Sequence, residues 1–249
     1  NSGAEQCGIA AIAPRNPQRL DRGLTDHDLL TLGVTSHADG HTDFGVIASI
    51  SEGLAYRRDD DFRRITEIAC AESLQLITLT ITEKGYQLNG YDGSYQDAVV
   101  KDLGRDPESD RMSTAMGLVT ALLVQRFHAG ATPVAVVSCD NFSHNGDMLR
   151  TSVLTIVAEW EKRGVIDHRV VEWIAEKVEF PISVIDKITP APSQKVAEQL
   201  AAMGLEDMGI DPDVEVAGFV NTEPAEYLVI EDRFPNGRPE LEKAGVYFT

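Results

Sequence analysis

Residues 134–146 read Val-Ala-Val-Val-Ser-Cys-Asp-Asn-Phe-Ser-His-Asn-Gly. An apolar, β-branched run stops at a cluster of small polar residues, and a helical pattern follows. This order is typical of a buried parallel strand whose carboxyl end opens into a site. Ligands of open α/β sheets bind in the crevice outside these strand ends. Asn141 therefore lies either at such a site or at the N-cap of the next helix, which asparagine also favours, and the pattern leaves both open.

Strand and helix patterns alternate along the chain, which predicts an α/β fold with a mostly parallel sheet. The expected strands are 7–13, 29–34, 45–50, 74–82, 134–137, 182–185, 214–220 and 227–230. The expected helices are 59–72, 112–129, one that carries Leu149 to Trp160 and ends at Gly164, 168–178 and 193–203. The turn signal Asp39-Gly40 allows the second and third strands to form an antiparallel excursion.

The composition is that of a soluble globular protein, with 249 residues, 43% hydrophobic and 25% charged. The formal net charge of -18 argues against binding to nucleic acid or to an anionic membrane. An anionic substrate stays open, because a few local cations can reverse the field inside a cleft. No apolar run approaches the roughly 20 residues of a membrane span, and no secretory signal is visible.

The cysteines are Cys7, Cys70 and Cys139. Their odd number and wide spacing argue against a disulfide framework and against a zinc site, so we expect a reducing, cytoplasmic setting. Cys139 adjoins the strand end and has two interpretations, a nucleophile or a small packing residue. We favour the packing residue, because no base stands near it in the sequence.

Three strand ends carry polar residues, Thr82-Glu83, Asp140-Asn141 and Asp186-Lys187. The ends of neighbouring strands in a doubly wound sheet line one crevice, so we expect these side chains to lie close together. Glu83 could equally be a solvated turn residue, and Asp186 and Lys187 could be charged residues at a strand exit. The residues alone therefore indicate an α/β protein with a polar cleft.

Four blocks extend this interpretation, and they lie at residues 79–86, 138–146, 180–190 and 227–239. They read Leu-Thr-Ile-Thr-Glu-Lys-Gly-Tyr, Ser-Cys-Asp-Asn-x-x-x-Asn-Gly, Phe-Pro-Ile-Ser-Val-Ile-Asp-Lys-Ile-Thr-Pro and Tyr-Leu-Val-Ile-Glu-Asp-Arg-Phe-Pro-Asn-Gly-Arg-Pro. In this order they resemble the mannitol dehydrogenase family of long-chain polyol and hexuronate dehydrogenases. The resemblance runs from Gly8 to the last residue. It implies a Rossmann-like, doubly wound dinucleotide-binding domain at 1–178 and the start of a C-terminal substrate domain at 179–249.

The resemblance also implies a reaction. The family transfers a hydride between a nicotinamide and a secondary alcohol or ketone, without a metal. Asn141 matches a catalytic asparagine whose amide donates to the oxygen that becomes negative in the transition state. Asp186 and Lys187 match the substrate site, although the family often has Asp-Arg there and lysine lacks the planar fork of arginine. The cofactor-binding candidates are Arg15, Glu83 and Asp140.

Two departures from the family pattern stand out. No Gly-x-Gly occurs in the chain, so the phosphate-binding turn of the first strand is missing. The family's lysine base and the Asn-x-x-His that follows it are absent too, and Lys243 is not a substitute. We therefore expect an interior fragment that lacks the first strand and most of the catalytic domain, and that does not turn over alone.

The cofactor and the substrate follow from weaker signals. We expect NAD, with NADP as an alternative, because the strand that ends at Ala13-Pro14-Arg15 carries no acid for the ribose. Residues 219–227 and Lys84 resemble the hexuronate branch, which favours fructuronate over a polyol such as mannitol. The alternative class is a non-catalytic α/β module that binds a nucleotide or a sugar acid. The oligomeric state stays open.

Overall fold

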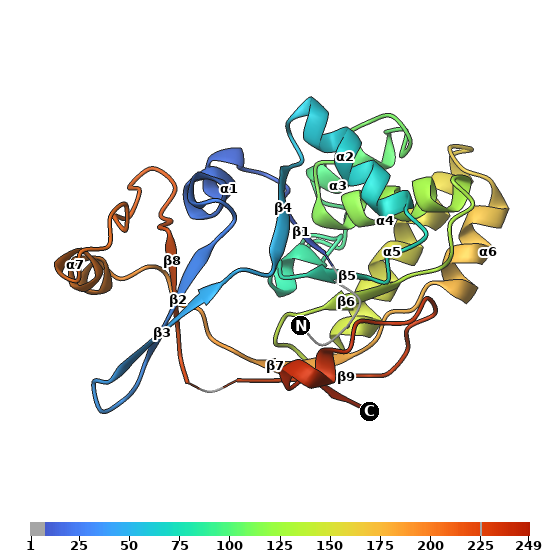
Figure 1. Ribbon diagram of the computed structural model, residues 1–249. Helices are drawn as coiled ribbons and strands as arrows, with labels where there is room; N and C mark the ends of the chain where they lie inside the picture. Colours follow the sequence, from blue (N-terminus) through green and yellow to red (C-terminus); the bar gives the residue numbers. More distant parts are fainter. Residues whose placement is uncertain (1–7, 225) are drawn as a thin grey trace. The chain divides into compact units, whose positions relative to one another are not determined.

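The computed structural model describes residues 8–224 and 226–249, and an expected strand residue, Cys7, lies outside them (Figure 1). The chain divides into two compact units, each built from two segments. Unit 1 comprises Asn1–Ile65 and Lys187–Glu226, and unit 2 comprises Thr66–Asp186 and Tyr227–Thr249. Helix α2 (Asp59–Cys70) begins in the first segment of unit 1 and continues into unit 2.

Unit 1 contains two small sheets. Strands β1 (Ile9–Ala13) and β4 (Ile50–Ala55) pair in parallel. The second sheet has the order β3-β2-β8, in which β2 (Thr31–Ser36) is antiparallel to β3 (Thr42–Ile47) and parallel to β8 (Phe219–Thr222). The predicted antiparallel excursion is confirmed, and Gly40 supplies its turn with a φ of 90°.

Two expected strands of unit 1 differ from the structure. The run 45–50 is not one strand, because β3 ends at Ile47 and the chain turns before β4, which pairs with β1 instead. The run 214–220 becomes a turn with Glu215 at a φ of 55°, and only its end enters β8. The helices of this unit are α1 (Pro17–Gly23), η1 (Thr25–His27) and α7 (Gln194–Ala202).

Helix α7 covers one face of the β2–β8 sheet. Its residues Ala197 and Leu200 share a buried cluster with Val34 of β2, with Phe219 of β8 and with Ala217, which precedes β8. Removing these apolar side chains from water stabilises the unit by roughly 25 cal/mol per Å².

Unit 2 holds the strand end identified from the sequence. Strands β5 (Leu76–Leu79) and β6 (Ala135–Ser138) pair in parallel, and every residue of β6 is buried. A second sheet has the order β10-β9-β7, with β7 (Ser183–Asp186) antiparallel to β9 (Tyr227–Ile230) and β10 (Tyr247–Phe248) parallel to β9.

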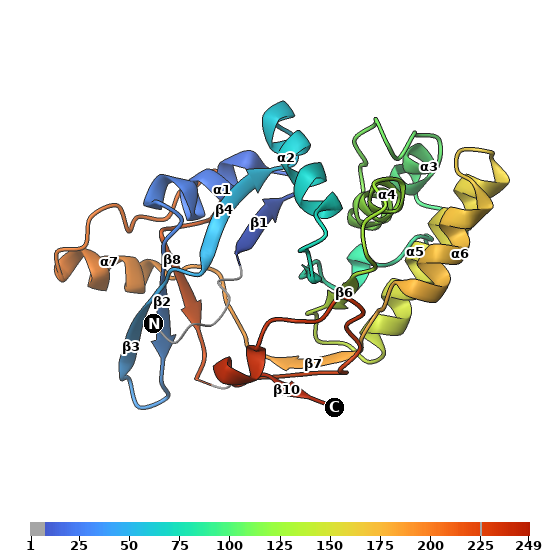
Figure 2. The same ribbon diagram turned by 45° about the vertical axis from the view of Figure 1, so that its right-hand side comes forward.

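Unit 2 also contains helices. They are η2 (Glu83–Gly85), α3 (Asp97–Leu103), α4 (Ala115–His128), α5 (Asn145–Lys162), α6 (His168–Lys177) and η3 (Leu241–Ala244). Helix α5 packs against both α4 and α6 (Figure 2). Helix α4 is buried on all sides from Met116 to Arg126, so its apolar sequence reflects full enclosure rather than an amphipathic surface. Gly130 and Gly164 follow α4 and α5 with φ values of 71° and 72°, as expected for glycines after helix ends.

The expected boundary near Glu179 does not coincide with the division into units. The Glu179 N–H donates to Val134 O at 3.3 Å, and Glu179 O accepts from the Val136 N–H at 2.9 Å. The chain therefore continues alongside β6 at this point instead of leaving the sheet. The assignment of 1–178 and 179–249 to two functional domains stays a prediction.

The α/β class predicted from the alternating pattern is confirmed, although α1, α3, β4 and β10 were not expected. Among the described residues, no helix is both long enough and apolar enough to cross a membrane.

Candidate active site at the ends of β5 and β6

Asp140 follows β6 and joins it to the turn after β5. Its carboxylate is buried and accepts hydrogen bonds from the Ile81 N–H at 2.8 Å, the Thr82 N–H at 3.0 Å and the Tyr86 hydroxyl at 2.6 Å. An ionised carboxylate has only acceptors, so it matches these donors. The two strand ends are thus joined by one side chain.

Tyr86 contacts both Asp140 and Ser138 from the buried core. Its ring is fully buried, and its hydroxyl also lies 2.7 Å from Ser138 Oγ. Burial and the hydrogen bond to Asp140 raise the pKa of Tyr86 far above its usual value, so the phenol keeps its proton. Because that proton points to Asp140, the Ser138 hydroxyl is the donor to Tyr86.

Thr82 has an unusual backbone conformation in the same turn. Its φ of 62° and ψ of 157° lie in a region that is essentially open to glycine alone. Such a conformation costs about 1–3 kcal/mol and persists only where the surroundings enforce it. The Thr82 side chain is exposed, so packing does not enforce it. Two hydrogen bonds hold its backbone instead. The Thr82 N–H donates to Asp140, and Thr82 O accepts from the Gly85 N–H at 2.9 Å.

Asn141 follows Asp140 directly. Its side chain is exposed and, within the part of the chain that the structure describes, has no hydrogen-bond partner. The alternative that Asn141 caps the next helix is wrong, because α5 begins at Asn145 and its N-cap is His144. A capping side chain binds the N–H two or three residues ahead, which Asn141 is too distant to do for α5. Its amide is free to bind a ligand.

Asn145 ties the end of β6 to the start of β7. Its amide donates to Asp140 O and to Ser183 O, both at 3.0 Å, and its carbonyl oxygen accepts from the Ser183 N–H at 3.1 Å. Ser183 Oγ donates in turn to Ser138 O. The β6 and β7 chains are therefore tied together beside Asn141.

Of the remaining predicted site residues, two belong to unit 2. Glu83 is exposed and begins η2, directly after Thr82. Asp186 is the last residue of β7 and is half-buried. Asp140 joins the β5 and β6 ends, and Asn145 ties β6 to the start of β7, whereas Asp186 is the last residue of β7. The expected grouping of all three strand-end side chains stays a prediction.

The other two belong to unit 1. Lys187 is half-buried, and its Nζ donates to Glu226 at 2.6 Å and to Glu223 O at 3.1 Å. Arg15 is exposed, follows β1 at its carboxyl end, and has no ion-pair partner in the described residues.

Cys139 lies between Ser138 and Asp140. Burial raises the pKa of its thiol to about 11, with a smaller contribution from the Asp140 charge. A thiol that is almost entirely protonated near neutral pH is a poor nucleophile, which favours the packing interpretation. Over residues 8–224 and 226–249, no group of three or more His, Cys, Asp or Glu side chains is arranged to hold a metal ion.

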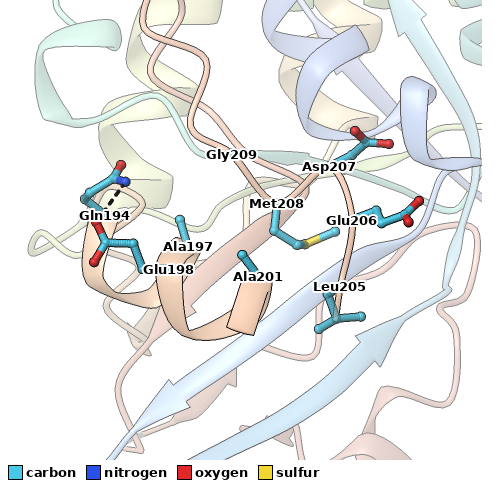
Figure 3. Close-up of a pocket in the computed structure, with 9 residues that line it drawn as sticks. All are labelled: Gln194, Ala197, Glu198, Ala201, Leu205, Glu206, Asp207, Met208 and Gly209. Atoms are coloured by element: carbon cyan, nitrogen blue, oxygen red, sulfur yellow. Dashed lines mark hydrogen bonds between the residues drawn. The ribbon is translucent and has the colours of Figure 1, made fainter. Parts of the chain in front are cut away.

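A cavity of about 500 Å³ lies elsewhere, in unit 1 (Figure 3). Helix α7 and the segment after it line this cavity with Gln194, Ala197, Glu198, Ala201, Leu205, Glu206, Asp207, Met208 and Gly209. None of the predicted site residues is among them. The cavity therefore does not support the roles predicted for those residues, and we do not assign it to the candidate active site.

Comparison with known families identifies the chain. The family model described as the mannitol dehydrogenase Rossmann domain matches residues 10–243. The chain belongs to the mannitol dehydrogenase family. The predicted Rossmann class follows, and the matched region extends across the expected boundary at Glu179.

Individual members of the mannitol dehydrogenase family resemble the chain over almost its whole length. A D-mannonate oxidoreductase from Thermotoga maritima is 42% identical over 246 residues, which cover 97% of this chain and 45% of that protein. The solved structure of Pseudomonas fluorescens mannitol 2-dehydrogenase, in a ternary complex with NAD and D-mannitol, matches with a TM-score of 0.77 and 30% identity, covering 97% and 46% of the two chains. A substrate-free D-sorbitol dehydrogenase structure matches with a TM-score of 0.80 and 28% identity, covering 98% and 48%. The chain thus spans about half the length of the relatives it matches.

Sequence reasoning missed two residues of this site. Asn145 stands inside the quoted motif but received no role, and Tyr86 was quoted only as part of a block. Asn145 is followed by Gly146, whose missing side chain leaves room for Phe180 O and Pro181 O, so a close approach at the start of α5 was a usable signal. The partner of Tyr86 lies 54 residues away in the sequence, and no local pattern reports it.

Proposed function

We propose that the chain is the part of an NAD(P)-dependent oxidoreductase that presents Asn141 to the reacting oxygen of a sugar acid or polyol. The observation that carries this proposal is the exposed amide of Asn141, which has no hydrogen-bond partner among residues 8–224 and 226–249 and follows the hydrogen-bonded Asp140 in a chain of the mannitol dehydrogenase family. An amide is a neutral donor that does not titrate near pH 7, which suits the binding of a developing oxyanion.

The residues of unit 1 are compatible with part of a dinucleotide site. Arg15 is an exposed cation with no ion-pair partner among the described residues, and it follows the carboxyl end of a parallel strand, where nucleotides bind in such sheets. We propose that Arg15 contacts the ribose or phosphate of the adenosine half of the cofactor. This contact is compatible with both NAD and NADP, and NAD remains our choice. The bound nicotinamide would supply or accept the hydride.

Glu83 and Asp140 are the other residues that we propose for the cofactor site. The Glu83 carboxylate is exposed and can accept hydrogen bonds from a ligand. The Asp140 carboxylate already accepts from Ile81, Thr82 and Tyr86, so we propose that it acts on the cofactor pocket through the turn it holds.

We propose a hexuronate such as fructuronate as the substrate, with mannonate as the reverse substrate. The similarity to a D-mannonate oxidoreductase supports this choice over mannitol. A carboxylate substrate needs a cation, and Lys187 is our candidate, with Asp186 as a hydroxyl acceptor beside it. Lys187 would exchange part of its bond to Glu226 for the substrate.

The test is a substrate comparison in the full gene product that contains residues 1–249. We expect NADH-dependent reduction of fructuronate to exceed that of tagaturonate and fructose in kcat/KM, and Asn141→Ala to lower kcat by about 10²–10³. Asn89→Ala, an exposed asparagine elsewhere in unit 2, is the control. A preference for fructose would replace the hexuronate by a polyol, and full activity of N141A would remove the proposed role of Asn141. Binding of a nucleotide without reduction of any of the three would favour the non-catalytic module.

A further inference from the structure

The turn after β5 is held in a conformation that its own sequence disfavours. Thr82 is β-branched, yet its φ is 62° and its ψ is 157°. The glycine of this turn is Gly85, whereas the strained position is occupied by a threonine. An exposed residue in such a conformation is held by its neighbours and not by its own preference.

The neighbours that hold it form a short buried chain of hydrogen bonds. Ser138 donates to Tyr86, Tyr86 donates to Asp140, and Asp140 accepts from the N–H groups of Ile81 and Thr82. Because the Tyr86 ring is fully buried, its hydroxyl cannot exchange this partner for water. The buried Tyr86 hydroxyl thus holds the Asp140 carboxylate from the side of the core.

Asp140 is also joined to Asn141 by a peptide bond. The Asp140 backbone is itself held, since Asp140 O accepts from the Asn145 amide at 3.0 Å and from the Phe142 N–H at 3.0 Å. Asp140 therefore fixes the Thr82 turn with its side chain and the start of the Asn141 loop with its backbone. Any movement of Asp140 changes both at once.

We propose that Asp140 and Tyr86 are positioning residues for the reaction, which hold Thr82 in its strained conformation and align the Asn141 amide with the reacting oxygen. This inference rests on the proposed function. Misplacing a reacting group by about 1 Å can cost about 100-fold in rate. We therefore expect the loss of the hydrogen bond between Tyr86 and Asp140 to lower kcat more than it weakens the binding of the cofactor.

The test uses the full gene product and compares Asp140→Asn and Tyr86→Phe with two matched controls. Asp102→Asn alters another buried aspartate of unit 2, whose carboxylate accepts from Ser113, Thr114 and Arg105. Tyr91→Phe alters an exposed tyrosine. We expect D140N and Y86F to lower kcat by about tenfold or more per folded molecule, and to change the Kd of NADH by a smaller factor than kcat. D102N lowers the melting temperature without this loss of kcat.

A second comparison isolates the strain. In a Thr82→Gly background, these backbone angles carry no steric strain, since glycine accepts them freely. We therefore expect D140N to cost clearly less in kcat in the T82G background than in the original chain. Equal losses in both backgrounds, or an unchanged kcat in D140N and Y86F, overturn the proposal.

These outcomes are separable from those for the proposed function. If N141A is inactive while D140N is fully active, the role of Asn141 stands and the positioning role fails. If N141A keeps full activity, the proposed function of Asn141 fails first.

Discussion

The side chain of Asn145 binds the backbone of Ser183 on both sides, donating to its carbonyl oxygen at 3.0 Å and accepting from its N–H at 3.1 Å. The two residues are 38 positions apart, at the start of α5 and the start of β7. One buried amide thus replaces a rung of sheet hydrogen bonds between the β6 and β7 chains. The arrangement ties the segment that precedes Asn141 to the start of β7, the strand that ends at Asp186.

Loss of this amide should destabilise the fold. Asn145→Ala removes the hydrogen bonds of the buried Ser183 N–H and C=O and leaves Asp140 O with the Phe142 N–H alone, so we expect a loss of about 2–4 kcal/mol in the free energy of unfolding. Urea unfolding of the full gene product measures it. Asn89→Ala, at an exposed asparagine, should change the midpoint little, and an equal shift in both variants would contradict the role of Asn145.

Gly146 should not accept a side chain. A Cβ there would lie 2.5 Å from Phe180 O and 2.8 Å from Pro181 O, both backbone atoms that cannot turn aside. We expect Gly146→Ala to cost about 1–3 kcal/mol as α5 is pushed from the chain before β7. Gly209→Ala is the matched control, because its Cβ would meet open space. A melting temperature unchanged in G146A would refute this close approach.

Thr114 caps α4 and also binds Asp102. Its Oγ1 accepts from the Gly117 N–H at 2.9 Å and donates to the Asp102 carboxylate at 2.7 Å. Thr114→Ala should therefore cost about 1–2 kcal/mol, and Thr114→Ser should restore most of it. Chemical denaturation of the three proteins decides between this and a purely steric role, for which serine would rescue nothing.

Cys139 should react only at high pH. Burial raises the pKa of its thiol to about 11, so the thiolate fraction, and with it the alkylation rate, rises about tenfold per pH unit until pH 11. Iodoacetamide labelling in a C7S/C70S background isolates this thiol. Rapid labelling at pH 7 would revive the nucleophile interpretation.

The same shift makes a stability prediction with a definite sign. The folded pKa lies above the unfolded value of about 8.5, so the contribution of Cys139 is full below pH 8.5 and declines as the pH rises toward 11. Cys139→Ser should flatten the dependence of unfolding free energy on pH in that window. A slope unchanged by C139S would contradict the assignment.

Lys187 should matter for acidic substrates alone, if the proposed hexuronate is correct. We expect Lys187→Met to raise KM for fructuronate by about tenfold, or roughly 1.4 kcal/mol, with little effect on KM for a neutral ketose. Lys195→Met, at an exposed lysine of α7, is the control. Equal effects on charged and neutral substrates would assign Lys187 to its bond with Glu226 instead.

The sequence by itself determined the kinds of element and their order. The expected helices over 59–72, 112–129, 168–178 and 193–203 all exist, and the strand 227–230 matches β9 residue for residue. This succeeds because burial of one face imposes a period on neighbouring residues, which is readable locally. It fails for α3 and β10, which are short and carry little pattern, and for β4, whose pairing with β1 joins residues about 40 positions apart.

The tertiary structure alone decided how the strand ends are joined. The strained Thr82, the buried Tyr86 and the amide of Asn145 act through partners 38 to 58 residues away, and the two compact units are each assembled from separate segments. Hydrogen bonds of this kind depend on which chain ends meet in space, and no local period records them. The sequence located Asn141 at a strand end and left its capping role open, and the structure excluded that role because α5 begins too far along the chain.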